Sequence, residues 1–379
     1  DIEVEYVEIP DINSHTINLN FDLVAISTYS AQAFEAYELA DRYRAKGIRV
    51  VIGGPHVSML PDEAQPHVDA VVIGEAEPVW MELISDFKDN RLKKHYKSHI
   101  PYDLSLSPLP RYDLLPIGQH NRILVQASRG CPHDCEFCAA SKCLGPYRRK
   151  PIELIVRDII AIKDRWENPF IEFADDNTFV DKKWGKELLL ALAPLNIKWF
   201  SETDISITQD NEVLQLLKDS GCRQLLIGFE SVIKNNLEGI EDNNWKLNRF
   251  DSYLAAISKI QSYGISVNGC FILGMDSDDE AIFERTKDFI EKSQLLEAQI
   301  TILTPFPGTR LYERLKREGR LLKDLFWDRC TLFDINFVPK NMTVNQLEDG
   351  LAWLGSQIYS DTNVHRRLSH YKEIIKTLI

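Results

Sequence analysis

Short apolar runs alternate with amphipathic segments along most of the chain. Runs at 23–26, 50–52 and 71–73 are short and mostly β-branched, which is typical of buried strands. Residues 31–45 place apolar side chains at helical spacing, and a further helix is predicted over 78–87. Residues 2–6 alternate strictly and predict a half-buried strand. Alternation of strands and helices predicts a doubly wound α/β domain with a parallel sheet over residues 1–90.

The same alternation returns after a linker predicted over residues 91–120, which contains four prolines and no sustained period. Six strand–helix units follow over 121–319 and predict a partial (β/α)6 barrel. Residues 320–379 predict a C-terminal segment with an extended stretch and two helices, which we expect to close the open side of the barrel. The six barrel strands are expected at 122–128, 170–174, 198–203, 224–229, 265–272 and 298–303.

Three cysteines lie within eight residues just after the first barrel strand: Cys131, Cys135 and Cys138. One loop can bring all three thiols to a single metal centre. Zinc usually takes four protein ligands, whereas three thiolates suit an iron–sulfur cube that leaves one iron open. A zinc site completed by Cys143 and three incidental core cysteines are the alternative interpretations.

Composition and charge narrow the class of protein. The 379 residues are enough for two or three domains, and the formal net charge of -13 disfavours sequence-independent nucleic-acid binding. The remaining four cysteines are dispersed without a pairing pattern, which indicates a reducing, cytoplasmic setting. No run approaches the roughly twenty apolar residues of a membrane span, so none is expected.

The cysteine spacing, with Phe137 just before the last cysteine and a strand and glycine before the first, resembles the signature of the radical S-adenosylmethionine (SAM) enzymes. The resemblance implies that the three cysteines hold a [4Fe-4S] cluster whose fourth iron is chelated by SAM. It further implies that an electron, supplied by a donor such as flavodoxin or ferredoxin, cleaves SAM to a 5′-deoxyadenosyl radical that abstracts hydrogen from the substrate.

Polar residues interrupt the apolar strands where barrel strands end, which is where such barrels place their active sites. Each one also fits a helix cap or a turn. The resemblance implies SAM contacts for Asp175 and Asp176 at the amino group. It implies further contacts, to the ribose, amino-acid and adenine portions, for Ser201, Glu202, Glu230, Phe137 and Gly274. No catalytic residue is predicted beyond the cluster ligands.

The first domain resembles the cobalamin-binding domain of one radical SAM subgroup. The matching positions follow its strands and fit ordinary turns equally well: Ser27, Thr28, Gly53, Gly54, Gly74 and Glu75. The Asp-x-His-x-x-Gly motif of other cobalamin proteins is absent, which implies cobalt without a histidine ligand. The chain begins at what would be the second strand, so the first strand and helix of this domain are expected to be missing.

The stretch 327–342 resembles the tail of cobalamin-type radical SAM proteins that include hopanoid methylases. The resemblance implies methyl transfer to an unactivated carbon of a small-molecule or lipid substrate. In that scheme one SAM methylates cobalamin, and a second yields the radical that prepares the substrate. The alternatives are a cobalamin-dependent cyclisation or rearrangement and a zinc-stabilised binding protein. Methylthio transfer to nucleic acid is disfavoured by the acidic charge.

Overall fold

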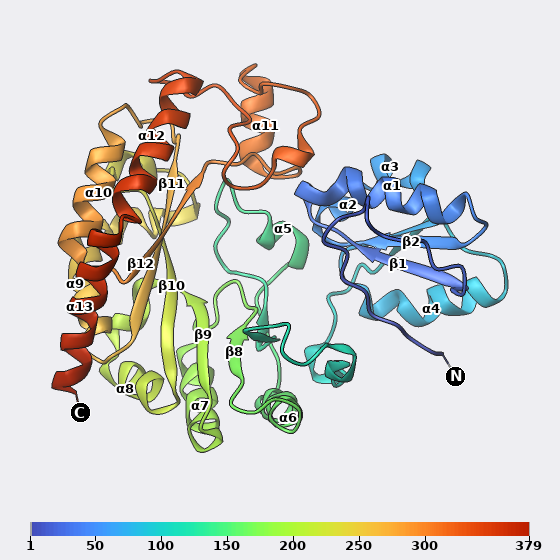
Figure 1. The fold of residues 1–379 in the computed structure, drawn as a ribbon, viewed down its shortest axis with the longest axis horizontal. Coiled ribbons are helices and arrows are strands. Elements are labelled where there is room, and N and C mark those ends of the chain that lie inside the picture. The colour runs from blue at the N-terminus through green and yellow to red at the C-terminus, as the bar shows by residue number, and fades with distance from the viewer. Residues whose placement is uncertain (1, 379) are drawn as a thin grey trace. The chain divides into compact units, whose positions relative to one another are not determined.

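The computed structural model describes residues 2–378 and divides the chain into two compact units (Figure 1). The first unit contains the chain up to Asp103 together with Glu136–Gly145 and Thr304–Phe337. The second contains Leu104–Cys135, Pro146–Leu303 and the chain from Val338 onwards. Each unit is therefore assembled from segments that lie far apart in the sequence.

The first unit contains a parallel sheet whose strands follow one another in chain order: β1 (Leu23–Ser27), β2 (Arg49–Gly53), β3 (Ala70–Ile73) and β4 (His95–Lys97). Strand β4 lies in the stretch predicted as linker. It is only three residues long, and Tyr96 is its single buried residue, so its apolar signal is weak. Pairing with β3 makes it one of the two edge strands of this sheet.

Helices cover both faces of this sheet, which confirms the doubly wound prediction. Strand residues alternate between the faces, so Val50 and Ile52 pack with one set of helices while Val51 packs with another. The first face carries α1 (Ala33–Arg44), α2 (Pro55–Met59) and α3 (Pro61–Ala64). The second face carries α4 (Glu77–Lys88). The unit also contains α5 (Ala140–Leu144) and α11 (Arg310–Arg317).

The strand predicted over residues 2–6 does not form, and this prediction is wrong. Ile2, Val4 and Tyr6 are exposed and lie outside any strand. Alternation shows which side chains a strand would direct to one face, but a strand also needs a neighbour that accepts its backbone hydrogen bonds. Among residues 2–378, no strand pairs with this segment.

All six predicted strands of the second unit form, as one parallel sheet in the order β12-β11-β10-β9-β8-β5. No pairing joins β5 to β12 in the described chain, so the sheet stays open as in a partial barrel. The strands are β5 (Ile123–Val125), β8 (Phe170–Phe173), β9 (Lys198–Thr203), β10 (Cys222–Glu230), β11 (Ser266–Leu273) and β12 (Glu297–Ile302). The helices between them are α6 (Ile152–Lys163), α7 (Lys182–Leu192), α8 (Asn211–Asp219), α9 (Tyr253–Gln261) and α10 (Ile282–Ser293). A short antiparallel ladder joins β6 (Ser128–Arg129) to β7 (Arg148–Arg149).

Two helices at the end of the chain, α12 (Val344–Ile358) and α13 (Asp361–Thr377), belong to the second unit. Thr343 and Gln346 form a capping box at the start of α12. The side chain of Tyr371 on α13 donates to the carbonyl of Gly264, which fixes that helix beside the turn before β11. No helix within residues 2–378 is both long enough and apolar enough to cross a membrane.

Candidate active site

The cysteine loop follows β5 and the turn through β6. Cys131 and Cys135 belong to the second unit, and Cys138, three residues further along the loop, belongs to the first. All three side chains are half-buried. Within residues 2–378, no three His, Cys, Asp or Glu side chains are gathered around a point where one metal ion could bind. Three thiolates from one loop fit a cluster that leaves one iron open, whereas a structural zinc site usually takes four protein ligands.

Asp175, just after β8, holds the chain that leads into this loop. Its Oδ1 accepts hydrogen bonds from the backbone N–H groups of Ala127 at 2.8 Å and Ser128 at 2.9 Å. Burial raises the pKa of Asp175 to about 6, although these hydrogen bonds oppose the shift. One oxygen of Asp175 is therefore committed to positioning the loop.

Two unpaired carboxylate oxygens lie at the carboxyl end of β8. Oδ2 of Asp175 and Oδ2 of Asp176 are both buried without a hydrogen-bond partner among the described residues. Burial also raises the pKa of Asp176. Because a buried carboxylate oxygen without a partner is costly, this edge is prepared for a hydrogen-bond donor or cation that binds there.

The next strand, β9, adds a further acidic group. Burial, together with the negative charges of Asp176, Glu172, Asp175 and Glu230, raises the pKa of Glu202 to about 7. Carboxylates that shift one another in this way lie within electrostatic range. Ser201, on the same strand, is fully buried, with its Oγ 2.6 Å from Oγ1 of Thr178. The structure thus brings together four of the predicted SAM residues around a shared negative field.

Glu230, at the end of β10, has a left-handed backbone with φ 64°. The register of β10 against β11 shifts between Gly228 and Glu230, which turns the Glu230 side chain away from its regular direction. Its Oε1 pairs with Nζ of Lys246 at 2.8 Å, and both side chains are nearly buried. Sequence reasoning missed Lys246, because a lone lysine in a polar loop gives no signal by itself.

Gly274 follows β11 in a turn held by Asp278. The N–H groups of Gly274 and Met275 donate to Oδ2 of Asp278 at 2.8 and 2.9 Å, and Asn236 donates to its Oδ1 at 2.6 Å. Burial raises the pKa of Asp278 to about 6 despite these hydrogen bonds. Asp278 was also missed from the sequence, where it lies in an acidic run that fits an exposed turn.

His133, inside the cysteine loop, is another residue that the sequence prediction missed. Its Nε2 lies 3.9 Å from Oδ2 of Asp204, its Nδ1 lies 3.8 Å from Oε2 of Glu241, and its ring centroid is 5.0 Å from that of Trp245. Burial alone raises the pKa of Asp204, but the nearby His133 ring and hydrogen bonds from Ser206 and Asn177 outweigh burial and lower the pKa. The imidazole thus links the loop to two carboxylates of the second unit.

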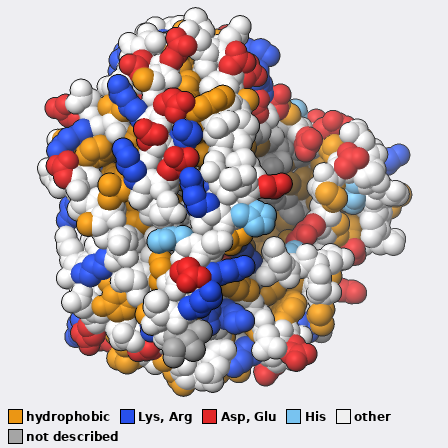
Figure 2. Space-filling view, turned by 60° about the vertical axis from the view of Figure 1, so that its left-hand side comes forward, with side chains coloured by type: hydrophobic (Ala, Val, Ile, Leu, Met, Phe, Trp, Pro, Cys, Tyr) orange, Lys and Arg blue, Asp and Glu red, His pale blue; other side chains and the backbone are white. Residues whose placement is uncertain are grey.

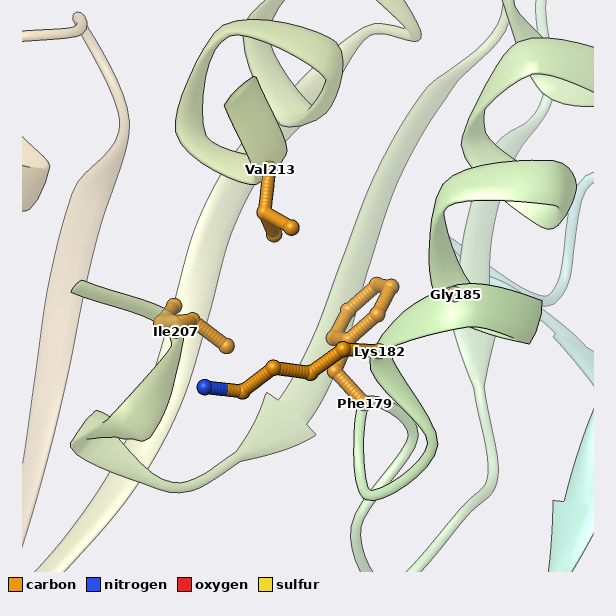
Figure 3. Close-up of a pocket in the computed structure, with 5 residues that line it drawn as sticks. All are labelled: Phe179, Lys182, Gly185, Ile207 and Val213. Atoms are coloured by element: carbon orange, nitrogen blue, oxygen red, sulfur yellow. The ribbon is translucent and has the colours of Figure 1, made fainter. Parts of the chain in front are cut away.

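A crevice between α7 and α8 is no part of this site. Phe179, Ile207 and Val213 line it, and the stem of Lys182 crosses one side (Figure 3). It has no room for a water molecule, so it is a packing gap in an apolar layer.

The predicted cobalamin edge of the first unit relies on close backbone contact. Gly54 has φ 107°, and a Cβ atom there would lie 2.5 Å from the carbonyl oxygen of Thr28. The Thr28 N–H donates to the Gly53 carbonyl at 3.2 Å, which ties the first two loops together. Only glycine fits position 54.

Ser58, on α2, links the second loop to the third. Its hydroxyl donates to the Gly54 carbonyl at 2.8 Å and accepts from the Gly74 N–H at 2.9 Å. Glu75, beside Gly74, accepts from the N–H of Tyr102 at 2.7 Å. The predicted residues of the first unit, Ser27 included at the end of β1, therefore lie on three loops that adjoin one another.

His56, directly after this edge, has both ring nitrogens occupied. Nδ1 lies 3.1 Å from Oγ of Ser30, and Nε2 lies 3.1 Å from Oε1 of Glu63. The other oxygen of Glu63 accepts from the indole of Trp327 at 2.9 Å. Both ring nitrogens of His56 are therefore engaged by side chains of the first unit, and cobalt without a histidine ligand stays a prediction.

Phe137 is half-buried in the first unit, next to Cys138. The contacts described above group Asp175, Asp176, Glu202 and Glu230 but do not include Phe137. Its proposed place near adenine stays a prediction.

Three family models match successive parts of the chain. The model of the B12 binding domain matches residues 1–84, and that of the radical SAM superfamily matches residues 125–290. A domain of unknown function, DUF4070, matches residues 309–378. These segments include both candidate edges and the tail.

Named relatives and a solved structure agree with these matches. Bacteriochlorophyllide d C-12(1)-methyltransferase of Chlorobaculum tepidum is 32% identical over 92% of this chain and 77% of its own length. Hopanoid C-2 methylase of Rhodopseudomonas palustris is 29% identical over 80% of this chain and 59% of its own length. The fold matches TsrM, a radical SAM methyltransferase from Kitasatospora setae with cobalamin and a [4Fe-4S] cluster bound. The TM-score is 0.65 at 14% identity, over 92% of this chain and 76% of that one.

The chain belongs to the radical SAM superfamily, in the group whose members also carry a B12-binding domain. The predicted enzyme class, radical SAM enzymes with methyltransferase relatives, is confirmed. The predicted cofactors are confirmed as well, because the radical SAM domain implies a [4Fe-4S] cluster with SAM and the B12-binding domain implies cobalamin. This assignment excludes the alternative interpretation of a zinc-stabilised binding protein.

Proposed function

We propose that this protein is a cobalamin-dependent radical SAM methyltransferase that methylates an unactivated carbon of a small-molecule or lipid substrate. The observation that carries the proposal is the group of buried carboxylates beside the three-thiol loop. Asp176, Glu202 and Glu230 share one negative field in the second unit, and Asp176 retains an unpaired oxygen there. Such a field favours a ligand with a positively charged group, as SAM has.

In this proposal Cys131, Cys135 and Cys138 are the cluster ligands. When bound, the cluster supplies the electron that cleaves SAM, and cobalamin carries the methyl group. Asp176 accepts a hydrogen bond from the SAM amino group, while Ser201, Glu202 and Glu230 face its ribose and amino-acid portions. Asp175 and Asp278 orient the loops that carry these residues, because each accepts hydrogen bonds from two backbone N–H groups of the loop that it orients.

The cobalamin site of the proposal lies on the first unit. Ser27, Thr28, Gly53, Gly54, Gly74 and Glu75 provide the edge, with Gly54 allowing the backbone to approach the ligand. We assign residues 1–90 and the edge strand β4 to this domain, the rest of 91–120 to the linker, 121–319 to the barrel and 320–379 to the tail that shapes the substrate pocket.

The proposal also includes the binding partners of the protein and its cellular location. We expect an electron donor such as flavodoxin or ferredoxin, no nucleic-acid partner, and a cytoplasmic location that keeps the thiols reduced. Figure 2 shows acidic side chains next to basic ones over the visible face, and the net charge of the chain is -13. A mixed, net acidic surface offers little of the clustered positive charge that phosphate backbones require.

The test begins with anaerobic reconstitution of the protein with iron and sulfide. The reconstituted protein is then assayed with reductant, SAM, cobalamin and candidate acceptors such as chlorophyllides and hopanoid lipids. The proposal predicts a brown protein that retains cobalamin, produces 5′-deoxyadenosine and transfers the labelled methyl group of SAM to an acceptor carbon. A rearranged acceptor without the label would instead support the cyclase alternative. A colourless zinc protein that leaves SAM intact would overturn the proposal.

A further inference from the structure

Lys246 lies in the segment between β10 and α9 and is almost completely buried. Its Nζ makes two contacts at 2.8 Å, one to Oε1 of Glu230 and one to the carbonyl oxygen of Gly228. A Cβ atom on Gly228 would overlap the Glu230 carboxylate and lie 3.2 Å from this Nζ. The glycine thus leaves the space in which the ion pair forms.

The segment that carries Lys246 is packed onto the cysteine loop. His133 of the loop faces Glu241, and its ring contacts Trp245, the residue immediately before Lys246. The guanidinium of Arg249 lies 4.0 Å from the centre of the Trp245 ring, and the Lys246 N–H donates to Oε1 of Glu241 at 2.6 Å. These contacts hold the lysine next to the loop in a defined position.

Electrostatics agree with this placement. Burial by itself lowers the pKa of Lys246, but the negative charges of Glu230 and of the Cys135 thiolate outweigh burial and raise the pKa. The ammonium therefore stays protonated across the working range of pH. It is a fixed positive charge on the segment that packs against the cysteine loop.

Stability alone does not explain a buried pair of this kind. Desolvation of two charges commonly cancels their attraction, so a buried ion pair contributes little net stability compared with apolar residues. Glu230 also adopts the left-handed backbone that residues other than glycine rarely occupy. Strain and buried charge together at the end of a barrel strand indicate a functional role.

We propose that Lys246 is a positioning residue that holds Glu230 at the edge of the SAM site and places a positive charge beside the cluster loop, where it favours the reduced form of the cluster. This inference rests on the proposed function. Reduction adds one negative charge to a cluster, and a nearby cation stabilises the state with the greater negative charge. Lys246 thus assists the step in which the external donor delivers its electron.

The test is a redox titration of the reconstituted enzyme without SAM, followed by electron paramagnetic resonance. Lys246→Met is expected to shift the reduction equilibrium at least tenfold toward the oxidised cluster, about 59 mV for a one-electron couple. Lys246→Arg keeps the charge and is expected to stay within threefold of wild type. Lys186→Met, which removes a lysine paired with Asp210 on the outer helices, is the matched control and is expected to leave the equilibrium unchanged.

Lys246→Met leaves Glu230 buried without a partner, which can prevent cluster assembly. The comparison of Glu230→Gln with the double variant Glu230→Gln/Lys246→Met avoids this, because the glutamate charge is absent from both. The double variant is expected to be harder to reduce. Equal midpoint potentials in this pair would overturn the inference while leaving the proposed function standing. A wild-type protein that assembles no cluster would overturn the proposed function itself.

Discussion

The candidate site of the second unit is built from buried charge, whereas that of the first unit is built from backbone and small neutral side chains. In the second unit Asp176, Glu202 and Glu230 share one negative field, with Lys246 as a buried counter-charge. In the first unit Gly54 and Ser58 connect three loops through backbone contact and one hydroxyl. Buried charge suits a small cationic ligand such as SAM, while exposed backbone suits a large ligand that covers the sheet edge.

The largest effect on activity is expected from a substitution in the cysteine loop. Cys135→Ala removes one of three thiolates, so the cluster and SAM cleavage are expected to fall below detection in iron, sulfide and 5′-deoxyadenosine assays. Cys143→Ala is the matched control, because this half-buried thiol lies in the segment just after the loop. Equal metal loss in both variants would point back to a four-thiol zinc site.

A smaller but still large effect is expected in the first unit. Gly54→Ala places a methyl group 2.5 Å from a carbonyl oxygen, at a φ of 107°. The expected cost is about 2 to 3 kcal/mol of unfolding free energy, with loss of cobalamin retention measured by absorbance. Gly355→Ala, in α12 with open space around it, is expected to gain up to about 1 kcal/mol instead. Normal cobalamin retention by Gly54→Ala would show that this edge is not the binding site.

The buried carboxylates of the second unit predict that the stability of the protein depends on pH. Glu202 has a folded pKa of about 7, above the ordinary value of 4.5. Between these two values the unfolded chain loses a proton that the folded chain keeps, so the stability of the apo protein is expected to fall as pH rises from about 4.5 to about 7. The single-site contribution is on the order of 1 to 3 kcal/mol.

The measurement is urea unfolding of the apo protein at pH 5 and pH 7.5, with Glu202→Gln alongside. The variant is expected to show a smaller loss of stability over this interval, because glutamine does not ionise. Asp175, with a pKa of about 6, contributes with the same sign and keeps part of the slope in the variant. An identical slope in variant and wild type would mean that Glu202 ionises normally.

The smallest effect tests the hydroxyl of Ser58. Ser58→Ala removes the group that joins Gly54 to Gly74, and a lost pair of hydrogen bonds of about 1 kcal/mol each predicts cobalamin binding weaker by roughly tenfold or more. Ser58→Thr keeps the hydroxyl and is expected to bind within threefold of wild type. Spectroscopic titration of cobalamin provides the measurement, and unchanged affinity in the alanine variant would assign Ser58 to the fold alone.

Much of the fold could be predicted because strands and helices here carry strong local signals. The six strands of the second unit each combine an apolar run with a following amphipathic helix, and all six form. The prediction of a strand over residues 2–6 was wrong, because the alternation of apolar and polar residues does not reveal whether a neighbouring strand exists. Strand β4 was missed because a three-residue edge strand with one buried side chain gives almost no pattern.

The sequence by itself determined the cysteine loop, the order of the six strands in the second unit and the glycines of the first unit, because each depends on spacing or backbone freedom within a few residues. Only the tertiary structure decided that Lys246 pairs with Glu230, that Asp278 holds the Gly274 turn and that His56 has no free nitrogen. In each of these three cases, the packing of the chain decides which groups lie within hydrogen-bond distance of the side chain. Burial and electrostatic partners depend on how distant segments pack, and a linear pattern does not record that packing.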